Sequence, residues 1–347
     1  MTTTTPAATP AVTPERLMQF AWGYAPPLIV AAAAQHGYFD ALATQPMTAA
    51  EISAVTETSE RGAKAILEAL VGLGLLAHDR DGRFVLTPES DTFLVSSRPA
   101  YMGGFFTHQC DDIIPRWLSI SQVVKTGVPA TPVNEESHGT EFFQKLVEIL
   151  FGVNYAPAMA LARGLNLPQE APIKVLDVAA GSGVWGIVFA KVYPNAFISA
   201  ADWEGVIPVT RRFAERHGLA DRMSYIPGDI DKSDFGTGYD VAILGHILHS
   251  EGEARSRTLL QRVYDALKPG GTIAIQEFLV NAERTGPPNG LLFAVNMLIA
   301  TKDGNTFSFE EIAGWLTSIG FVDPRTLEVP GPSPIVLATK SVNASSS

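Results

Sequence analysis

A short stretch near the middle of the chain, KVLDVAAGSGVWG at positions 174–186, has the residue types of a nucleotide-binding loop. Gly181, Gly183 and Gly186 are spaced as G-x-G-x-x-G, and glycine lets a backbone lie directly against a bound molecule. Asp177 stands four residues before the first of these glycines, at the end of a predicted strand. A carboxylate there would repel a pyrophosphate but suits an ammonium group, so the stretch favours S-adenosylmethionine over a dinucleotide.

Acidic residues also end the next two predicted strands. Asp202, in ISAADWEG, lies about twenty residues after the loop, where a carboxylate can accept both hydroxyls of a ribose. Asp229, in YIPGDI, could accept from the exocyclic amine of adenine while Ile230 covers the ring. Trp203 is a candidate for packing on the adenosine, and a core position fits it equally well. Together these residues describe an adenosine site.

From Ile173 onward, short β-branched runs alternate with helical stretches. The predicted strands are IKVLDVA, AFISAAD, MSYIPGD, YDVAILGH and GTIAIQEFL, and the helical stretches between them include VWGIVFAKV and SRTLLQRVYDAL. This alternation predicts an α/β fold with a doubly wound, mostly parallel Rossmann-like sheet. Ligands of such sheets bind beyond the carboxyl ends of the strands, where Asp177, Asp202 and Asp229 stand.

The residues before this sheet predict a smaller, mostly helical domain. Thr48 and Glu51 have capping-box spacing at the start of one helix, and Ser59 is a candidate N-cap of the next. An Asp81-Gly82 turn between apolar runs then predicts a hairpin, so the order is that of a winged helix. We place a disordered tail at 1–14, the winged-helix domain at 15–105, a helical connector at 106–170 and the α/β domain at 171–342.

The composition limits the kinds of partner that this protein is expected to have. A formal net charge of −11 argues against nucleic acid or an anionic membrane as the main partner and favours a small molecule. The second winged-helix segment offers Arg61 and Lys64 but also several glutamates, which would oppose phosphate contacts. No apolar run approaches the ~20 residues that span a bilayer, and the single cysteine, Cys110, suits a reducing compartment, so we expect a cytoplasmic protein.

With these elements in this order, the chain resembles the bacterial and plant family of S-adenosylmethionine-dependent small-molecule O-methyltransferases. Residues 173–322 resemble the class I methyltransferase domain, and the winged-helix region resembles the domain that forms an intertwined homodimer. The resemblance covers nearly the whole chain except the N-terminal tail and the last few residues. It implies S-adenosyl-L-methionine as cofactor and methyl transfer to a hydroxyl of a small, aromatic or polyketide-like acceptor.

The resemblance also implies roles for residues after the fourth and fifth strands. The segment GHILHSEGEA matches the family segment that carries the general base, which becomes His249. Imidazole, with an unperturbed pKa near ~6.5, suits removal of a hydroxyl proton at neutral pH. Glu277 matches a family glutamate that holds the histidine, while Gly245 and His246 are expected to line the cofactor pocket. His246 and His249 could form a metal pair, but no third ligand is evident, so we expect no metal.

Acceptor-binding residues follow from the same resemblance. Tyr155 and Met159, in YAPAMA, match a segment that borders the acceptor and the methyl donor. Phe293, Asn296 and Met297 lie on a predicted helix that lines the acceptor pocket in the family. Asn296 is an amide on an otherwise apolar helix, so it needs a hydrogen-bond partner if it is buried.

The sequence departs from the family pattern at a few positions and leaves other functions open. The family has Asp-Trp after the histidine where this chain has Ser250 and Glu251, and Thr306 replaces a second glutamate. These departures leave open a carbon or nitrogen methyltransferase, or a relative that binds the cofactor without transferring a methyl group. The winged helix alone allows a ligand-sensing DNA-binding regulator, and the glycines alone allow a nicotinamide-dependent oxidoreductase.

Overall fold

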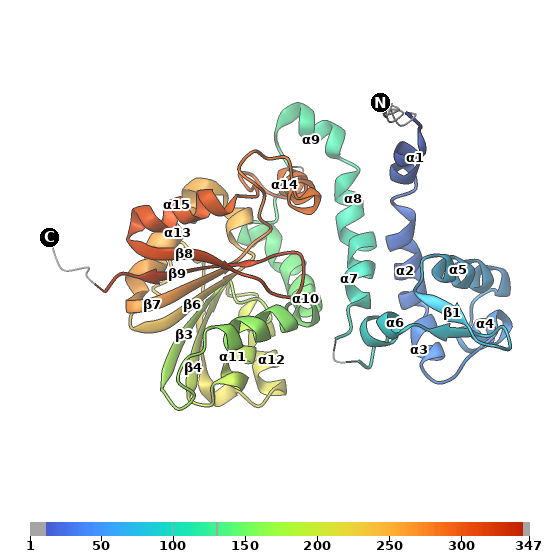
Figure 1. The fold of residues 1–347 in the computed structure, drawn as a ribbon, viewed down its shortest axis with the longest axis horizontal. Helices are drawn as coiled ribbons and strands as arrows, with labels where there is room; N and C mark the ends of the chain where they lie inside the picture. Colours follow the sequence, from blue (N-terminus) through green and yellow to red (C-terminus); the bar gives the residue numbers. More distant parts are fainter. Residues whose placement is uncertain (1–11, 99, 130, 343–347) are drawn as a thin grey trace, which may run out of the picture. The chain divides into compact units, whose positions relative to one another are not determined.

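The computed structural model describes residues 12–98, 100–129 and 131–342, so most of the predicted tail at 1–14 lies outside the described residues. The chain divides into two compact units, Met1–Asp111 and Asp112–Ser347 (Figure 1). The boundary falls within a short π-helical stretch, η1 (Gln109–Ile113). The segment predicted as a connector, 106–170, is divided between the two units, and its bounds stay a prediction.

The first unit consists of helices and one antiparallel hairpin. Its elements are α1 (Glu15–Ala21), α2 (Ala25–Gln35), α3 (Tyr38–Leu42), α4 (Ala49–Val55), α5 (Glu60–Gly72), β1 (Leu76–His78), β2 (Phe84–Leu86), α6 (Pro88–Phe93) and α7 (Gly103–His108). The predicted order of helix, helix and hairpin is confirmed by α4, α5 and the β1–β2 pair. Buried side chains from α2, α3, α5 and the hairpin form its core.

Local sequence signals set the element boundaries in this unit. Thr48 and Glu51 form a capping box at the start of α4, and the Ser59 side chain accepts from a backbone amide at the start of α5. Gly82 takes a left-handed φ of +74° in the turn between β1 and β2, as the predicted hairpin requires. The proline pair at 26–27 lies in the first turn of α2, so it begins a helix rather than interrupting one.

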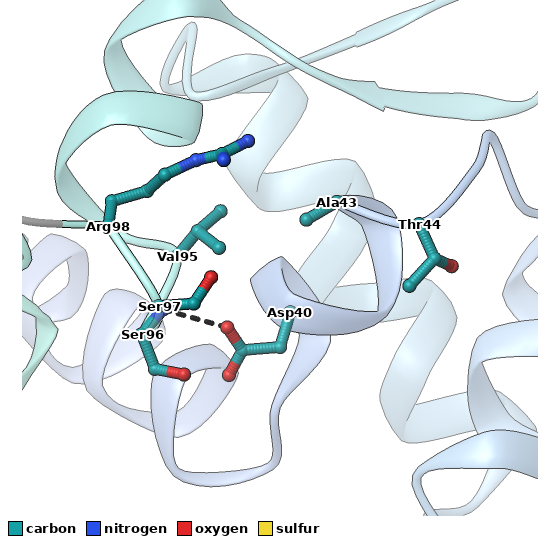
Figure 2. A pocket seen from close by; sticks show the side chains of 7 residues that line it. All are labelled: Asp40, Ala43, Thr44, Val95, Ser96, Ser97 and Arg98. Atoms are coloured by element: carbon teal, nitrogen blue, oxygen red, sulfur yellow. Dashed lines mark hydrogen bonds between the residues drawn. The ribbon is translucent and has the colours of Figure 1, made fainter.

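Figure 2 shows a recess on the first unit, lined by Asp40, Ala43, Thr44, Val95, Ser96, Ser97 and Arg98. The Ser96 amide donates to Asp40 Oδ1 at 2.7 Å, which ties the segment after α6 to α3. Arg98 pairs with Asp91 at 2.6 Å. Both charged groups of the recess therefore have partners within the unit, and we assign it a structural role.

The second unit is built on a seven-stranded sheet in the order β5-β4-β3-β6-β7-β9-β8. Its strands are β3 (Ile173–Val178), β4 (Ala196–Asp202), β5 (Met223–Pro227), β6 (Tyr239–Gly245), β7 (Leu267–Gln276), β8 (Phe321–Leu327) and β9 (Ile335–Lys340). The strands from β3 to β7 pair in parallel, while β9 pairs antiparallel with both β7 and β8. The predicted mostly parallel, doubly wound sheet is confirmed.

Helices cover both faces of this sheet (Figure 1). The helical elements of the unit are α8 (Ile114–Trp117), α9 (Ile120–Thr126), α10 (Glu136–Gly164), α11 (Val184–Val192), α12 (Ile207–Arg216), η2 (Ala220–Arg222), α13 (Leu248–Ala266), α14 (Pro288–Ala300) and α15 (Phe309–Ile319). One apolar core joins α10, α11 and α12 to the sheet, and a second joins α13 and α15 to its other face. Strand order reverses at β3, because β4 lies on one side of it and β6 on the other, and ligands of such folds bind at that point.

The antiparallel pair β8 and β9 was not predicted. The β8 segment contains Pro324, and Asp323 takes a left-handed φ of +54°. The register of β8 against β9 shifts between Val322 and Arg325, so the alternation of exposed and buried residues is broken there. A bulged edge strand of this kind lacks the periodicity from which strands are predicted.

Two helical stretches, Glu15–Gln35 and Gly139–Gly164, are long and apolar enough to cross a membrane by length and composition. This corrects the expectation that no apolar stretch approaches that length. The second stretch belongs to α10, which packs on α11 of the same unit. Core helices of soluble proteins can be equally long and apolar, so the length and composition of these two stretches do not decide the matter. The cytoplasmic location and the lack of a membrane partner stay predictions.

Candidate active site

The glycine loop connects β3 to α11 and has the backbone that the sequence predicts. Gly181 and Gly183 take left-handed φ values of +57° and +74°. Asp177, at the end of β3, is fully buried, and its Oδ2 accepts a 2.9 Å hydrogen bond from the Gly186 amide. Burial raises the pKa of Asp177 to about 8. The carboxyl group of Asp177 thus accepts from the backbone at the start of α11. Its Oδ1 has no hydrogen-bond partner among the described residues, and its contact with a ligand stays a prediction.

Asp202 joins the end of β4 to the glycine loop. Its Oδ2 accepts from the Gly181 amide and its Oδ1 from the Trp203 amide, both at 2.7 Å. A carboxylate oxygen accepts two hydrogen bonds, so each oxygen keeps one position for a ribose hydroxyl. Burial raises the pKa of Asp202 to about 6, although the two backbone hydrogen bonds favour the charged form. The contact of Asp202 with a ribose stays a prediction.

The first turns of α10 lie against the residues that follow β4. The Trp203 ring meets the Phe143 ring edge-on, with centroids 5.6 Å apart. Gln144 Nε2 donates to the Gly205 carbonyl at 2.6 Å. The indole of Trp203 therefore has an aromatic partner within the protein, and its predicted packing on adenosine remains a prediction.

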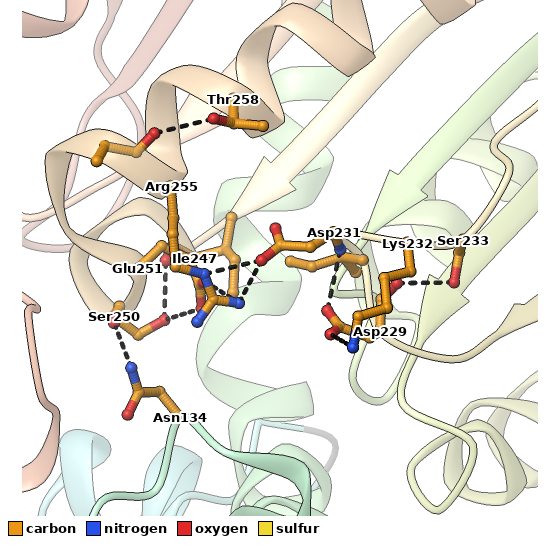
Figure 3. Close-up of polar contacts among 12 residues, drawn as sticks. Asn134, Asp229, Asp231, Lys232, Ser233, Ile247, Ser250, Glu251, Arg255 and Thr258 are labelled. Carbon is orange, nitrogen blue, oxygen red and sulfur yellow. Dashed lines mark hydrogen bonds and ion pairs between the residues drawn. The ribbon is translucent and has the colours of Figure 1, made fainter.

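Asp229 and Ile230 follow β5 and have different surroundings. Asp229 Oδ1 accepts from the Asp231 amide at 3.0 Å, and its Oδ2 lies 3.2 Å from Lys232 Nζ (Figure 3). Burial works against the charge, but these contacts hold the pKa of Asp229 below its usual value. Ile230 is buried in the core on the α13 side of the sheet. Asp229 thus remains an ionised acceptor at the strand end, as an adenine contact requires.

Gly245 and His246 end β6 and adjoin protein groups. A Cβ atom at Gly245 would lie 2.2 Å from Trp185 Nε1, so the indole requires glycine there. His246 takes a left-handed φ of +61°, and its amide donates to the Gln276 carbonyl at 2.9 Å. Burial lowers the pKa of His246 to about 4, and its Nδ1 has no partner among the described residues. A neutral imidazole with an open nitrogen is consistent with the predicted place beside the cofactor.

His249 forms a buried pair with Glu277. His249 Nδ1 lies 2.7 Å from Glu277 Oε2, and the His249 amide donates to Oε1 at 3.3 Å. Burial alone would raise the pKa of Glu277, but the adjacent His249 lowers it below its usual value. An ionised Glu277 accepts the Nδ1 proton, which leaves the lone pair on Nε2. The contact that the family pattern implies between Glu277 and His249 is therefore present in the structure.

Aromatic rings line the side of His249. The Phe293 ring meets the His249 ring edge-on, with centroids 4.9 Å apart, and packs at a tilt of 32° against the Phe278 ring, with centroids 4.2 Å apart. His246 lies 4.9 Å from Phe278 on the other side. These rings form a wall of planar groups next to the imidazole, which suits a planar acceptor.

The α14 helix also supplies a polar group. Asn296 Oδ1 accepts from Trp117 Nε1 at 2.9 Å, so the amide has the partner that its predicted position requires. With the oxygen held by the indole, the Asn296 amino group is the donor left for another molecule. Met297, the next residue, is buried.

Tyr155 and Met159 lie on α10 and pack against the apolar core on the α11 side of the sheet. The Tyr155 ring faces Phe151 at 6.1 Å and Lys191 Nζ at 5.7 Å. These contacts are those of core residues. A role for either side chain in acceptor binding stays a prediction.

Thr306, which replaces the second family glutamate in sequence, makes no side-chain hydrogen bond to His249. It is buried, and its Oγ1 has no hydrogen-bond partner among the described residues. Ligand atoms of His246, His249 and Glu277 lie within 4.8 Å of one another, a spacing that could hold a metal ion. Glu277 is thus a third possible ligand beside the two histidines, which corrects the expectation that no third ligand is present; that the enzyme needs no metal stays a prediction.

Comparison with known proteins bears on what this site does. Residues 166–322 match the O-methyltransferase domain, and residues 18–96 match the O-methyltransferase dimerisation domain. The 3-hydroxy-5-methyl-1-naphthoate 3-O-methyltransferase of Streptomyces sahachiroi is 30% identical over 337 residues, with 94% of this chain and 96% of that enzyme covered. The chain belongs to the O-methyltransferase family.

Further relatives of this O-methyltransferase agree with that assignment. The tetracenomycin polyketide synthesis 8-O-methyl transferase TcmO of Streptomyces glaucescens is 26% identical over 306 residues, covering 87% of this chain and 89% of that protein. The crystal structure of a candidate O-methyltransferase from Nostoc punctiforme PCC 73102 superposes with a TM-score of 0.85 at 26% identity, covering 96% of this chain and all of that one. The protein is an S-adenosylmethionine-dependent O-methyltransferase, and the oxidoreductase alternative is wrong.

Some residues around the O-methyltransferase site were missed at the sequence level. Trp117 contacts Asn296 across 179 positions of sequence, and nothing local marks that pair. Asn134, which bonds the backbone beside His249, lies in a loop whose composition indicated only a connector. Phe278 directly follows Glu277, so an aromatic residue at a strand end could have been included.

Proposed function

We propose that this enzyme methylates a hydroxyl of a small aromatic, polyketide-type acceptor and that His249 removes the hydroxyl proton. The observation that carries the proposal is the buried contact of His249 Nδ1 with Glu277 Oε2 at 2.7 Å. A carboxylate in this position fixes the ring tautomer and stabilises the imidazolium that forms when Nε2 takes a proton. A hydroxyl becomes a stronger nucleophile as its proton leaves, which is what oxygen methylation needs.

The cofactor contacts proposed for this reaction come from three strand ends. When bound, S-adenosylmethionine supplies an electrophilic methyl group. We infer that the backbone at Gly181 and Gly183 approaches it, that Asp202 accepts its ribose hydroxyls and that Asp229 accepts its adenine amine. The left-handed glycines, the two open positions on Asp202 and the ionised Asp229 support this assignment.

The acceptor class is supported by the side chains around His249. Phe278 and Phe293 present two aromatic rings, packed against each other, beside the imidazole, and these match a flat aromatic molecule in polarity. The Asn296 amino group would donate to an oxygen of that molecule, because Trp117 holds the amide oxygen. Two relatives are named for hydroxynaphthoate methylation and for tetracenomycin polyketide synthesis, which favours the same class.

An acceptor panel with isotope-labelled S-adenosylmethionine tests the substrate class. The panel contains a hydroxynaphthoate, the same naphthoate without the hydroxyl, an aliphatic alcohol and an aromatic amine. We expect label in the hydroxynaphthoate and none in its matched control, because the wall of rings selects the aromatic body and His249 needs a hydroxyl proton. Label that enters only the amine or the alcohol would overturn the proposed acceptor class.

We also propose that the enzyme is a homodimer formed through the first unit. Helix α1 and the turn that joins it to α2 carry large apolar side chains that are more than half exposed: Leu17, Met18, Phe20, Trp22 and Tyr24. A run of exposed apolar groups of this size is typical of a protein interface, and the segment falls largely within the matched dimerisation domain. Light scattering of the purified enzyme should give twice the mass of one chain, and a single-chain mass at micromolar concentration would contradict the proposal.

A further inference from the structure

The turn that carries His249 is set apart from the helix that follows it. Gly252 takes φ +73° and ψ 172° inside α13, so the residues before it form a turn distinct from the rest of the helix. A Cβ atom at Gly252 would lie 2.5 Å from the Asp303 carbonyl oxygen, so the turn packs closely on the segment after α14. The position of His249 therefore depends on contacts outside α13.

One of these contacts is a buried ion pair of Glu251, two residues after His249. Glu251 Oε2 lies 2.8 Å from Arg255 Nη2, and its side chain is only 6% exposed. The same guanidinium contacts Asp231 Oδ2 through Nε at 2.9 Å and through Nη2 at 2.7 Å (Figure 3). Arg255 thus joins the histidine turn to the segment after β5.

That segment leads directly to the proposed adenine contact. The Asp231 amide donates to Asp229 Oδ1 at 3.0 Å, so one chain of contacts runs from Asp229 through Asp231 and Arg255 to Glu251 (Figure 3). On the other side of the turn, Asn134 Nδ2 donates to the Ser250 carbonyl at 3.0 Å. The turn is therefore held between the cofactor-binding strand end and the segment that leads into α10.

The ion pair between Glu251 and Arg255 differs from an ordinary surface ion pair in its burial and in its number of partners. Two carboxylates share one guanidinium, and burial raises the pKa of Glu251 to about 7 in spite of Arg255. Only Glu251 is buried, since the Arg255 side chain is 40% exposed; removing Arg255 would leave this buried carboxyl group without its partner, which costs more than breaking a pair in which both side chains are exposed. The neighbouring pair Glu253–Arg257 has the same spacing and the same 2.8 Å separation but is about half exposed, so it provides a matched comparison.

We propose that Glu251 is a positioning residue that, through Arg255 and Asp231, couples the adenine end of the cofactor site to the position of His249. The inference rests on the proposed function, because it assumes His249 as the base and Asp229 as the adenine contact. The proposal assigns a role to Glu251, which together with Ser250 departs from the family pattern. Where the family has Asp-Trp, this protein has at Glu251 a carboxyl group that Arg255 connects to Asp231, in the segment after β5.

The first test compares Glu251→Gln with the matched control Glu253→Gln. We expect kcat with a hydroxynaphthoate to fall by about tenfold or more in E251Q, because small displacements of a catalytic group are costly, while KM changes little. E253Q should keep wild-type values of both constants. Arg255→Met should reproduce the loss, and the E251Q/R255M double variant should lose no more than the single variants, because both remove one interaction.

A second readout separates coupling from a merely structural effect. In the wild type, S-adenosylhomocysteine should slow amide hydrogen exchange both in the glycine loop, 179–183, and in the histidine turn, 247–252. In E251Q the loop should stay protected and the turn should not. Wild-type kcat in E251Q, or retained protection of its turn, would overturn the inference. If E251Q does not fold, the same two measurements are made on R255M, because the Arg255 side chain is 40% exposed and its replacement disturbs the core less. Wild-type kcat or retained protection of the turn in R255M would then overturn the inference.

The two proposals fail in different ways. If the wild type methylates none of the hydroxyl acceptors, but S-adenosylhomocysteine protects its turn and not that of E251Q, the proposed acceptor and base are wrong. The link from the cofactor site to the turn through Glu251 then stands without a catalytic role for His249. If hydroxynaphthoate is methylated and E251Q behaves as the wild type does, the coupling is wrong and the proposed function stands.

Discussion

The His249→Ala variant is expected to methylate a hydroxyl acceptor about 10²- to 10⁴-fold more slowly than the wild type, the range that a positioned general base supplies. The variant loses the ring that Glu277 holds at 2.7 Å, and with it the nitrogen that takes the hydroxyl proton. The proposed contacts to ribose and adenine come from Asp202 and Asp229 instead. Calorimetric titration with S-adenosylhomocysteine should therefore give wild-type affinity, while the rate measured with saturating acceptor falls.

The matched control for this variant is His217→Ala, which removes a histidine from the same unit. His217 stacks on Phe151 at the end of α12, away from the proposed base. We expect near-wild-type kcat in this control. An unchanged kcat in His249→Ala would remove His249 from the role of base, and a loss of cofactor affinity in that variant would assign the histidine to binding.

The Asp202→Asn variant is expected to bind S-adenosylhomocysteine about 100-fold more weakly, a cost of about 3 kcal/mol. Both carboxylate oxygens accept from backbone amides, Gly181 on one side and Trp203 on the other, at 2.7 Å. An asparagine in that place would turn its amino group toward one of these N–H donors, so a donor would face a donor. The loop would then lose an anchor, and the ribose would lose an acceptor.

Calorimetry on Asp202→Asn and on the exposed control Asp221→Asn measures this effect. The control lies in the short η2 turn, outside the proposed pocket, and should bind as the wild type does. Equal affinities in the two variants would contradict the assignment of Asp202 to the ribose. If the two hydrogen bonds of Asp202 also stabilise the loop, the ligand-free Asp202→Asn protein should unfold at a lower temperature than the wild type.

Much of the second unit could be predicted because its signals are local. The buried strands β3 to β7 are short apolar runs with polar ends, and that pattern shows in a window of a few residues. The glycine spacing placed the loop, and the family pattern placed His249 and Glu277. These two side chains are 28 positions apart but end neighbouring parallel strands, so the sheet brings them together.

Contacts that depend on distant segments were not predictable. No sequence pattern links Trp117 to Asn296 or Asn134 to Ser250, because each pair forms only when separate elements pack. The sequence also does not show in which direction a side chain at a strand end points. Asp177 was expected to face the ligand; the structure adds a hydrogen bond from the Gly186 amide to its Oδ2, which the sequence did not indicate, and the ligand contact stays a prediction.

Residue identity alone also did not separate ligand contacts from packing. Gly245 was assigned to the cofactor pocket, and the structure shows a second reason for it, since a Cβ atom there would meet the indole of Trp185. Glu251 was a departure from the family pattern with no use in sequence terms. Its partner Arg255 lies one helical turn later, but the burial that gives the pair its importance arises only from the folded chain.

The position of the transferred methyl group tests the central claim most directly. The wild-type enzyme is incubated with a hydroxynaphthoate and S-adenosylmethionine carrying a carbon-13 methyl group, and the product is examined by NMR. We predict that the labelled carbon is bonded to the phenolic oxygen and that the His249→Ala variant forms almost none of this product in the same time. A label bonded to a ring carbon, or equal amounts of product from both proteins, would contradict oxygen methylation with His249 as the base.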